Sequence, residues 1–170
     1  MTEIIHSLAY LTERFILQKE YLLASSKYGV KFKFKAADAV GRSIYKHKEY
    51  EPEIIRFVLN EIQYNANDIV IDIGANIGWY ALHLEKIAKL DRIYAFEPDP
   101  LNYALFKENI QLNNAIKIIA INKALANKNG TAMLYKYSEK NLGRHSMLPL
   151  FNGDSEKVET ILGYSFQKEI

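Results

Sequence analysis

The chain reads Ile69-Val70-Ile71-Asp72-Ile73-Gly74-Ala75-Asn76-Ile77-Gly78 at the point that decides its fold. The first five residues are mostly apolar and β-branched, which is the composition of a parallel strand covered on both faces. The two glycines allow a tight turn into a helix and a close approach of the backbone to a ligand. We therefore expect a central strand over residues 69–73 that ends in a ligand-binding turn.

Further strands and helices alternate after this turn. Apolar runs and turn residues predict a helix over 77–90, a strand over 92–97, a turn over 98–100, a helix that reaches about Leu112, and a strand over 116–121. Such alternation produces right-handed βαβ units and a parallel sheet that binds ligands at the carboxyl ends of its strands. The sequence thus predicts an α/β, Rossmann-like fold with flanking helices.

The regions on either side of this core are less regular. Apolar residues between Ile4 and Leu23 recur at helical spacing, which predicts one amphipathic helix whose apolar stripe covers its own domain. Alternating lysine and phenylalanine predict a strand over 31–35, and Pro52 opens a helix that reaches Ile62. We divide the chain into an N-terminal helical segment, residues 1–29, and the cofactor-binding part of a domain, residues 30–170.

An acidic residue at the end of the second strand indicates which cofactor the turn binds. Glu97 is placed to accept hydrogen bonds from both hydroxyls of a ribose. The run Gly74-x-Asn76-x-Gly78 lacks the third glycine of a dinucleotide fingerprint, which makes a nicotinamide cofactor the weaker match. S-adenosylmethionine needs a ribose acid and polar partners for its amino acid end. Although the glycines alone could simply close a turn, their combination with Glu97 favours S-adenosylmethionine.

Composition restricts the compartment and the partners. The 170 residues, 49% of them hydrophobic, suit one compact domain, and a net charge of +2 from scattered Lys and Arg shows no nucleic-acid or membrane footprint. No cysteine is present, and the N-terminus shows neither a signal peptide nor a membrane span. We expect a cytoplasmic protein that binds neither nucleic acid nor membrane. The four histidines show no metal spacing, so no metal site is predicted, and no catalytic base is identified.

Residues 70–80, followed by Ala95-Phe96-Glu97-Pro98, resemble the cofactor motifs of the FkbM-like methyltransferase family. The resemblance extends to Tyr50-Glu51-Pro52 and to Asn141-x-Gly143-x-x-Ser146. It implies a class I methyltransferase fold in which the turn holds the methionine end of the cofactor, Glu97 the ribose, and residues near Lys123 the adenine. The residues expected to bind the cofactor are Glu51, Asp72, Gly74, Ala75, Asn76, Gly78, Glu97, Pro98, Lys123 and Ala124.

The same resemblance implies O-methylation of a small-molecule or sugar hydroxyl. The sheet is expected to be incomplete after its third parallel strand, as in a member truncated at the C-terminus. This would leave an apolar edge at residues 69–73, open to a second copy or a complementing chain. Two alternatives stay open: an inactive remnant that only binds the cofactor, and a nicotinamide-dependent oxidoreductase fragment.

Overall fold

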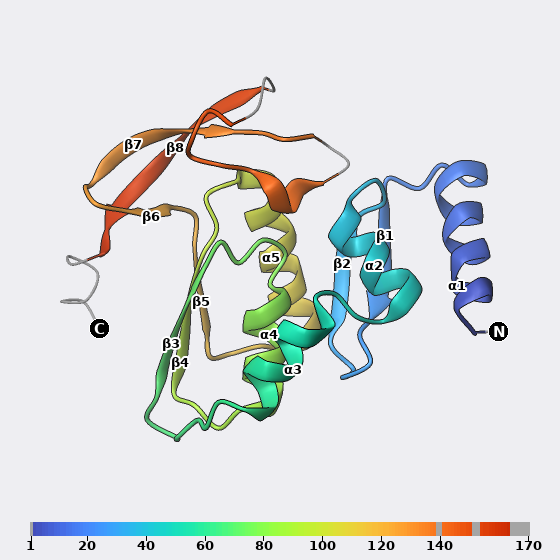
Figure 1. Cartoon of the computed structure of the whole chain (residues 1–170), viewed down its shortest axis with the longest axis horizontal. Helices are drawn as coiled ribbons and strands as arrows, with labels where there is room; N and C mark the ends of the chain where they lie inside the picture. Colours follow the sequence, from blue (N-terminus) through green and yellow to red (C-terminus); the bar gives the residue numbers. More distant parts are fainter. Residues whose placement is uncertain (1, 139–140, 151–153, 164–170) are drawn as a thin grey trace.

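The computed structural model describes residues 2–138, 141–150 and 154–163. Its centre is a parallel sheet of β3 (Ile69–Ile73), β4 (Arg92–Phe96) and β5 (Ile118–Ile121), in the order β3-β4-β5. The helices α3 (Pro52–Asn60), α4 (Trp79–Ile87) and α5 (Pro100–Asn113) lie on one face of this sheet (Figure 1). The predicted α/β fold with a parallel sheet and flanking helices is confirmed.

β3 differs from the expectation in its position within the sheet. β4 is the central strand and is buried over most of its length, whereas β3 pairs only with β4 among the described residues. The exposed fractions of Ile71 and Ile73 are 46% and 64%. The prediction of a central strand covered on both faces was wrong, because apolar composition does not specify how many neighbours a strand has, whereas the expected apolar edge at residues 69–73 is present among the described strands. β3 is an apolar edge.

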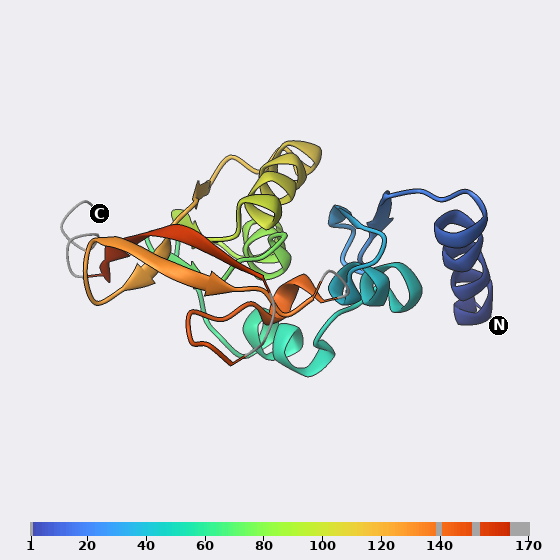
Figure 2. The same cartoon turned by 90° about the horizontal axis from the view of Figure 1, so that it is seen from above.

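The N-terminal region forms a small module beside the helices. β1 (Tyr21–Ser25) and β2 (Lys31–Lys35) form an antiparallel hairpin that crosses the expected boundary between residues 29 and 30. α2 (Ala39–His47) packs on this hairpin, and α1 (Thr2–Leu11) packs on α2 at the far end of the molecule (Figure 2). Phe32 and Phe34 of β2 are fully buried, as the alternating pattern predicts.

The first helix is shorter than its periodicity predicts. α1 ends at Leu11, a π-helical turn follows over Thr12–Ile16, and residues 21–23 belong to β1. Its expected apolar stripe is exposed, at 66% for Ile4 and 60% for Leu8. Tyr10 is buried instead, and its hydroxyl donates to the carbonyl oxygen of Ala36 at 2.5 Å. A hydrogen-bonded aromatic ring therefore fixes the face of α1 that meets the domain.

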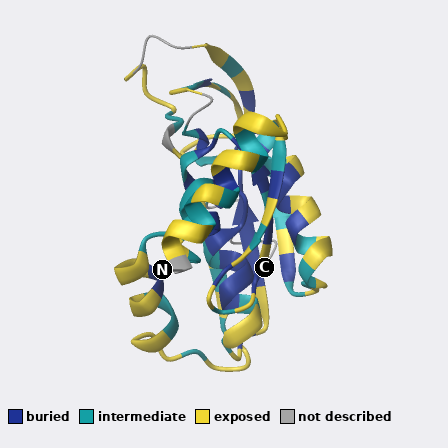
Figure 3. Ribbon diagram, turned by 90° about the vertical axis from the view of Figure 1, so that its right-hand side faces the viewer, coloured by how far each residue is buried: buried dark blue, intermediate teal, exposed yellow. Residues whose placement is uncertain are grey.

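The C-terminal part of the chain forms a second sheet. β6 (Ala124–Ala126) and β7 (Gly130–Tyr135) lie on either side of β8 (Ser155–Leu162), parallel and antiparallel to it respectively. The segment between β7 and β8 includes a 3-10 turn, η2 (Leu142–Arg144), close to the start of α5 (Figure 1). Buried residues gather inside the molecule, and the outer helix faces are exposed (Figure 3). None of the described helices has the length and apolar character that crossing a bilayer requires.

Asn109 of α5 joins the N-terminal module to the sheet. Its side chain accepts from the Lys33 backbone N–H at 2.6 Å and donates to the carbonyls of Lys33 and Ile77 at 3.1 and 3.0 Å. We expect Asn109→Ala to lower the free energy of unfolding by about 2–4 kcal/mol, because buried backbone groups lose their partners. Urea denaturation measures this loss.

Asn113 provides the matched control, one helical turn further along α5. It makes the equivalent pair of hydrogen bonds to the backbone of Lys31, but in an exposed position where water replaces them. Asn113→Ala should therefore cost less than about 1 kcal/mol. Equal losses for the two variants would contradict the role assigned to the buried Asn109.

His83 of α4 is a buried neutral histidine. Its Nδ1–H donates to the Trp79 carbonyl at 2.6 Å, and its Nε2 lies 2.8 Å from the Ser26 hydroxyl. Burial lowers the pKa of His83 to about 4. The unfolded chain takes up this proton below about pH 6.5, so His83 reduces stability as the pH falls from 6.5 towards 4.

This titration predicts a loss of about 2–3 kcal/mol from His83 between pH 7 and pH 4.5. Denaturant unfolding of the wild type and His83→Gln at both pH values isolates the contribution, because the buried carboxyl groups are common to both proteins. A pH dependence that is identical in the two proteins would rule out His83 as the cause.

Candidate functional site

The turn after β3 brings a row of backbone groups to the end of β4. Gly74, Asn76 and Gly78 have φ angles of 81°, 53° and 92°, in the region that favours glycine. The N–H groups of Gly74 and Ala75 both donate to the Phe96 carbonyl at 2.9 Å. The turn is therefore fastened to the last residue of β4, next to Glu97.

Glu97 is held in place by two backbone donors. Its Oε2 accepts from the N–H of Asn76 at 2.7 Å, and its Oε1 accepts from the N–H of Asp99 at 2.9 Å. The residue is 5% exposed, and burial raises the pKa of its carboxyl group to about 7 against the opposing effect of these hydrogen bonds. Each carboxylate oxygen keeps a second lone pair for a ligand hydroxyl.

A cavity of about 110 Å³ lies at the carboxyl ends of β3 and β4. Four of the ten residues expected to bind the cofactor line it together, and the C-terminal segment over residues 142–145 covers it. The volume is below the ~300–1,000 Å³ of most ligand pockets, so a whole nucleoside cofactor would need this cover to shift outward. The residues expected from the sequence that line the cavity are Gly74, Asn76, Glu97 and Pro98.

Glu51 and Asp72 lie elsewhere, beside Tyr80 of α4. The Tyr80 hydroxyl donates to Oε2 of Glu51 in a short hydrogen bond. Oδ2 of Asp72 is buried without a hydrogen-bond partner among the described residues, and burial raises the pKa of this carboxyl group to about 6. Both acids lie close to Tyr80, and neither of them lines the cavity.

The remaining expected residues support the surrounding structure. The side chain of Ala75 is buried in the core, and a Cβ atom on Gly78 would lie 2.3 Å from the Phe106 ring. Lys123 forms an ion pair with Glu159 at 3.2 Å, and Ala124 of β6 is buried against Leu134 and Val158 of the second sheet. Their assignment to cofactor binding stays a prediction.

Asn102 and His145 are cavity residues that the sequence does not identify as part of the site. Asn102 lies three residues after the helix-capping Asp99, and His145 belongs to the polar loop over residues 141–146. The only sequence signals are the spacing of Asn102 from Asp99 and the titratable side chain of His145 in that loop. Their proximity depends on packing between distant segments.

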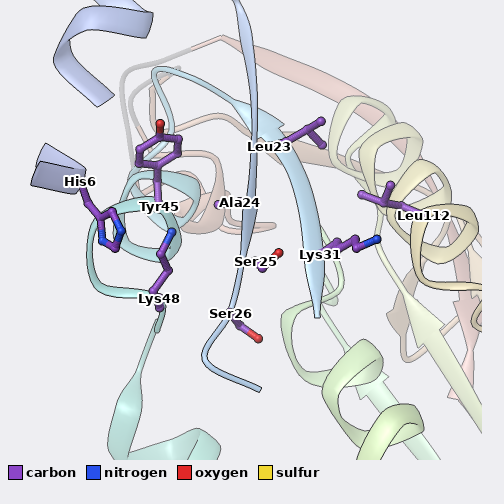
Figure 4. Close-up of a pocket in the computed structure, with 9 residues that line it drawn as sticks. All are labelled: His6, Leu23, Ala24, Ser25, Ser26, Lys31, Tyr45, Lys48 and Leu112. Atoms are coloured by element: carbon purple, nitrogen blue, oxygen red, sulfur yellow. The ribbon is translucent and has the colours of Figure 1, made fainter. Parts of the chain in front are cut away.

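A larger cavity of about 660 Å³ lies beside the N-terminal hairpin (Figure 4). It contains none of the residues expected to bind the cofactor. Parallel sheets bind ligands at the carboxyl ends of their strands, so position and polar lining favour the smaller cavity as the cofactor site. The larger cavity is lined by His6, Leu23, Ala24, Ser25, Ser26, Lys31, Tyr45, Lys48 and Leu112.

The parallel βαβ units, the glycine turn and the acid at the end of β4 define a class I S-adenosylmethionine-dependent methyltransferase fold. The orphaned Oδ1 of Asn76 and the open space at Gly74, where an added Cβ would meet nothing within 4 Å, fit such a cofactor. The chain belongs to the TRM5/TYW2 methyltransferase domain family, whose model matches residues 25–132.

Individual relatives match shorter stretches. A tRNA(Phe) (4-demethylwyosine(37)-C(7)) aminocarboxypropyltransferase of Methanocaldococcus jannaschii is 40% identical over 62 residues, 35% of this chain and 25% of that protein. Methyltransferase sdnD of Sordaria araneosa is 34% identical over 70 residues, 41% of this chain and 27% of that protein. The matches thus span about a quarter of the length of these curated relatives.

A solved structure also resembles this chain. M. jannaschii TYW2 in complex with AdoMet has a TM-score of 0.48 and 27% identity, over 61% of this chain and 43% of that one.

The family match corrects two expectations. The resemblance to the FkbM-like family was wrong, because residues 25–132 match the TRM5/TYW2 family model. The motifs after the first two strands are those that many methyltransferases need to hold the same cofactor, so they did not separate the families. S-adenosylmethionine is the cofactor of this family, which leaves the nicotinamide alternative without support.

The exclusion of nucleic acid, with a small-molecule hydroxyl as acceptor, was also wrong. The family and the M. jannaschii relative, named as a tRNA(Phe)-modifying transferase, overturn it. The low net charge was misleading because it is the sum of a basic region and an acidic region. The first 50 residues contain nine Lys and Arg but five Asp and Glu, so they are basic while the remainder is acidic.

Proposed function

We propose that this chain binds S-adenosylmethionine at the cavity beside the carboxyl ends of β3 and β4 and transfers its methyl group to a base of transfer RNA. The observation that carries the proposal is the buried Glu97 carboxylate, oriented by Asn76 and Asp99 within the region matched by the family. Membership of a family named for TRM5 and TYW2 supports transfer RNA as the acceptor. The proposal includes a cytoplasmic location for the protein.

The residues of the cavity have separate tasks in this proposal. The turn at Gly74 lets the backbone approach the methionine end of the cofactor, and Glu97 accepts hydrogen bonds from the ribose hydroxyls. When bound, S-adenosylmethionine supplies an activated methyl group on its sulfonium sulfur. This proposal keeps the cofactor-binding part within residues 30–170.

The test begins with binding. Calorimetric titration of the full chain with S-adenosylhomocysteine should show binding, and NAD should show none; light scattering confirms that the protein is not aggregated. If folded protein binds neither compound, the proposed cofactor site is wrong.

The second step measures transfer. Unmodified transfer RNA transcripts are incubated with the chain and S-adenosylmethionine that carries an isotopic label in its methyl group, and the nucleosides are then analysed by mass spectrometry. A labelled methylated nucleoside supports the proposal. The mass gain also distinguishes methyl from aminocarboxypropyl transfer, the activity named for the M. jannaschii relative. Cofactor binding without transfer to any transcript would instead support a binding-only remnant.

A further inference from the structure

Three residues that line the candidate cofactor cavity each have one buried polar atom without a hydrogen-bond partner among the described residues. These atoms are Oδ1 of Asn76, Oδ1 of Asn102 and Nε2 of His145. Asn102 is 1% exposed, and the side chain of His145 is 6% exposed. Native proteins rarely leave buried polar atoms unpaired, because water or a partner normally satisfies them. Three of them around one cavity indicate the positions of ligand atoms.

Asn102 presents an acceptor to the cavity. Its Nδ2 donates to the carbonyl oxygen of Leu142 at 3.2 Å. Because a carbonyl oxygen can only accept, this contact fixes the orientation of the amide and leaves Oδ1 on the other side. The unpaired Oδ1 therefore requires a donor, such as a hydroxyl or an amino group.

His145 presents a donor to the same cavity. Its Nδ1 accepts from the backbone N–H of Tyr137 at 3.2 Å, so the neutral ring carries its proton on Nε2. Burial lowers the pKa of His145, which favours this neutral form, although Asp99 opposes the shift. Nε2 lies 3.6 Å from Oδ2 of Asp99, too far for a hydrogen bond. The N–H group thus has no hydrogen-bond partner among the described residues, although Oδ2 of Asp99 lies near it.

We propose that Asn102 and His145 bind the adenosyl group of S-adenosylmethionine, Asn102 as acceptor and His145 as donor. This inference rests on the proposed function. The amino edge of adenine carries a donor beside ring-nitrogen acceptors, and a ribose hydroxyl is both donor and acceptor, so either matches the pair. Asn102 lies within residues 25–132, which the family model matches, whereas His145 lies outside this range.

The two residues also connect the ligand with the cover of the cavity. Leu142 is held from both sides, by Asn102 at its carbonyl and by Oδ1 of Asp38 at its N–H, 2.9 Å away. The cover thus forms part of the binding surface rather than a separate loop. A bound adenosyl group would provide hydrogen-bond partners for the unpaired atoms of Asn102 and His145.

Calorimetric titration with S-adenosylhomocysteine tests the inference on the full chain. We expect Asn102→Ala and His145→Phe to weaken binding three- to tenfold each, the loss of one buried hydrogen bond. His145→Gln, which keeps an N–H donor, should remain within about twofold of the wild type. His47→Phe changes a half-exposed histidine on α2 and is the matched control, with wild-type affinity expected.

Analogues of the ligand identify the part of the adenosyl group that is bound. S-inosylhomocysteine lacks the amino group of adenine, and the 2′-deoxy and 3′-deoxy analogues each lack one ribose hydroxyl. Because Glu97 is assigned to the ribose hydroxyls, the wild type should lose affinity for both deoxy analogues whatever Asn102 binds. The informative analogue is the one that Asn102→Ala no longer distinguishes from the parent compound: the inosyl analogue assigns Asn102 to the base, and a deoxy analogue assigns it to the ribose.

The possible outcomes distinguish failure of this inference from failure of the proposed function. If the wild type binds and both Asn102→Ala and His145→Phe bind equally well, the inference is overturned while the cofactor site stands. If the wild type does not bind, both fail. Thermal unfolding of each variant checks its fold, and the comparison of His145→Phe with His145→Gln decides the question should Asn102→Ala not fold.

Discussion

Gly78→Ala should lower the free energy of unfolding by about 2–5 kcal/mol. Gly78 has a φ of 92°, which an alanine adopts only with strain. The added Cβ would also lie 2.3 and 2.4 Å from two atoms of the buried Phe106 ring and 3.0 Å from Leu82. Backbone strain and overpacking therefore act together at the start of α4. Urea denaturation measures the loss.

Gly74→Ala is the matched control, four residues earlier in the same turn. Gly74 has a similar φ of 81°, but an added Cβ would meet nothing within 4 Å. Only the backbone strain remains, about 1–2 kcal/mol. If the two variants lose the same stability, contact with Phe106 does not determine the requirement for glycine at position 78.

Glu97→Ala should weaken S-adenosylhomocysteine binding at least tenfold. A hydrogen bond to a charged group contributes about 1.5–3 kcal/mol, and about 1.4 kcal/mol corresponds to a factor of ten in affinity. The substitution also removes the acceptor for the N–H groups of Asn76 and Asp99, so the turn loses its support. Calorimetry measures the affinity. Unchanged binding would disprove the assignment of Glu97 to the ribose.

Glu97→Gln removes the charge of the carboxylate but keeps nearly the same side-chain size. The pH dependence of binding provides a second readout. The pKa of Glu97 is about 7, so wild-type affinity should rise between pH 6 and pH 8 as the carboxyl group ionises, whereas Glu97→Gln should lack this rise. Because this pKa is above the value of 4.5 of an ordinary Glu, ionised Glu97 opposes folding at and above pH 7. That cost disappears as the pH falls towards 4.5.

Local sequence predicts the βαβ core well, because strands, turns and helix starts each depend on neighbouring residues. The errors occur where distant pairing decides the structure. Residues 21–23 have helical spacing, yet they pair with residues 33–35 in the hairpin. The strand over residues 69–73 was expected to be covered on both faces, but its burial depends on how many neighbours the rest of the chain provides.

The candidate site likewise contains residues that local sequence predicts and residues that only long-range packing brings to it. Gly74, Asn76 and Glu97 are recognisable because their roles follow from positions at strand ends, within one βαβ unit. Asn102 and His145 reach the same cavity only because residues 142–145 pack across the start of α5. No short-range pattern contains that contact, so sequence analysis could not identify this wall of the cavity.

Asp38 makes the structure around α2 depend on a residue that is synthesised much later. Its buried carboxylate accepts from the N–H of Gly41 at the start of α2 and from the N–H of Leu142, 104 residues later. On the ribosome, α2 emerges long before its capping residue can acquire the second of these partners. The N-terminal module should therefore reach full protection from amide hydrogen exchange only after residue 142 has left the exit tunnel. Exchange at Gly41 and Leu142 should then report a common opening event.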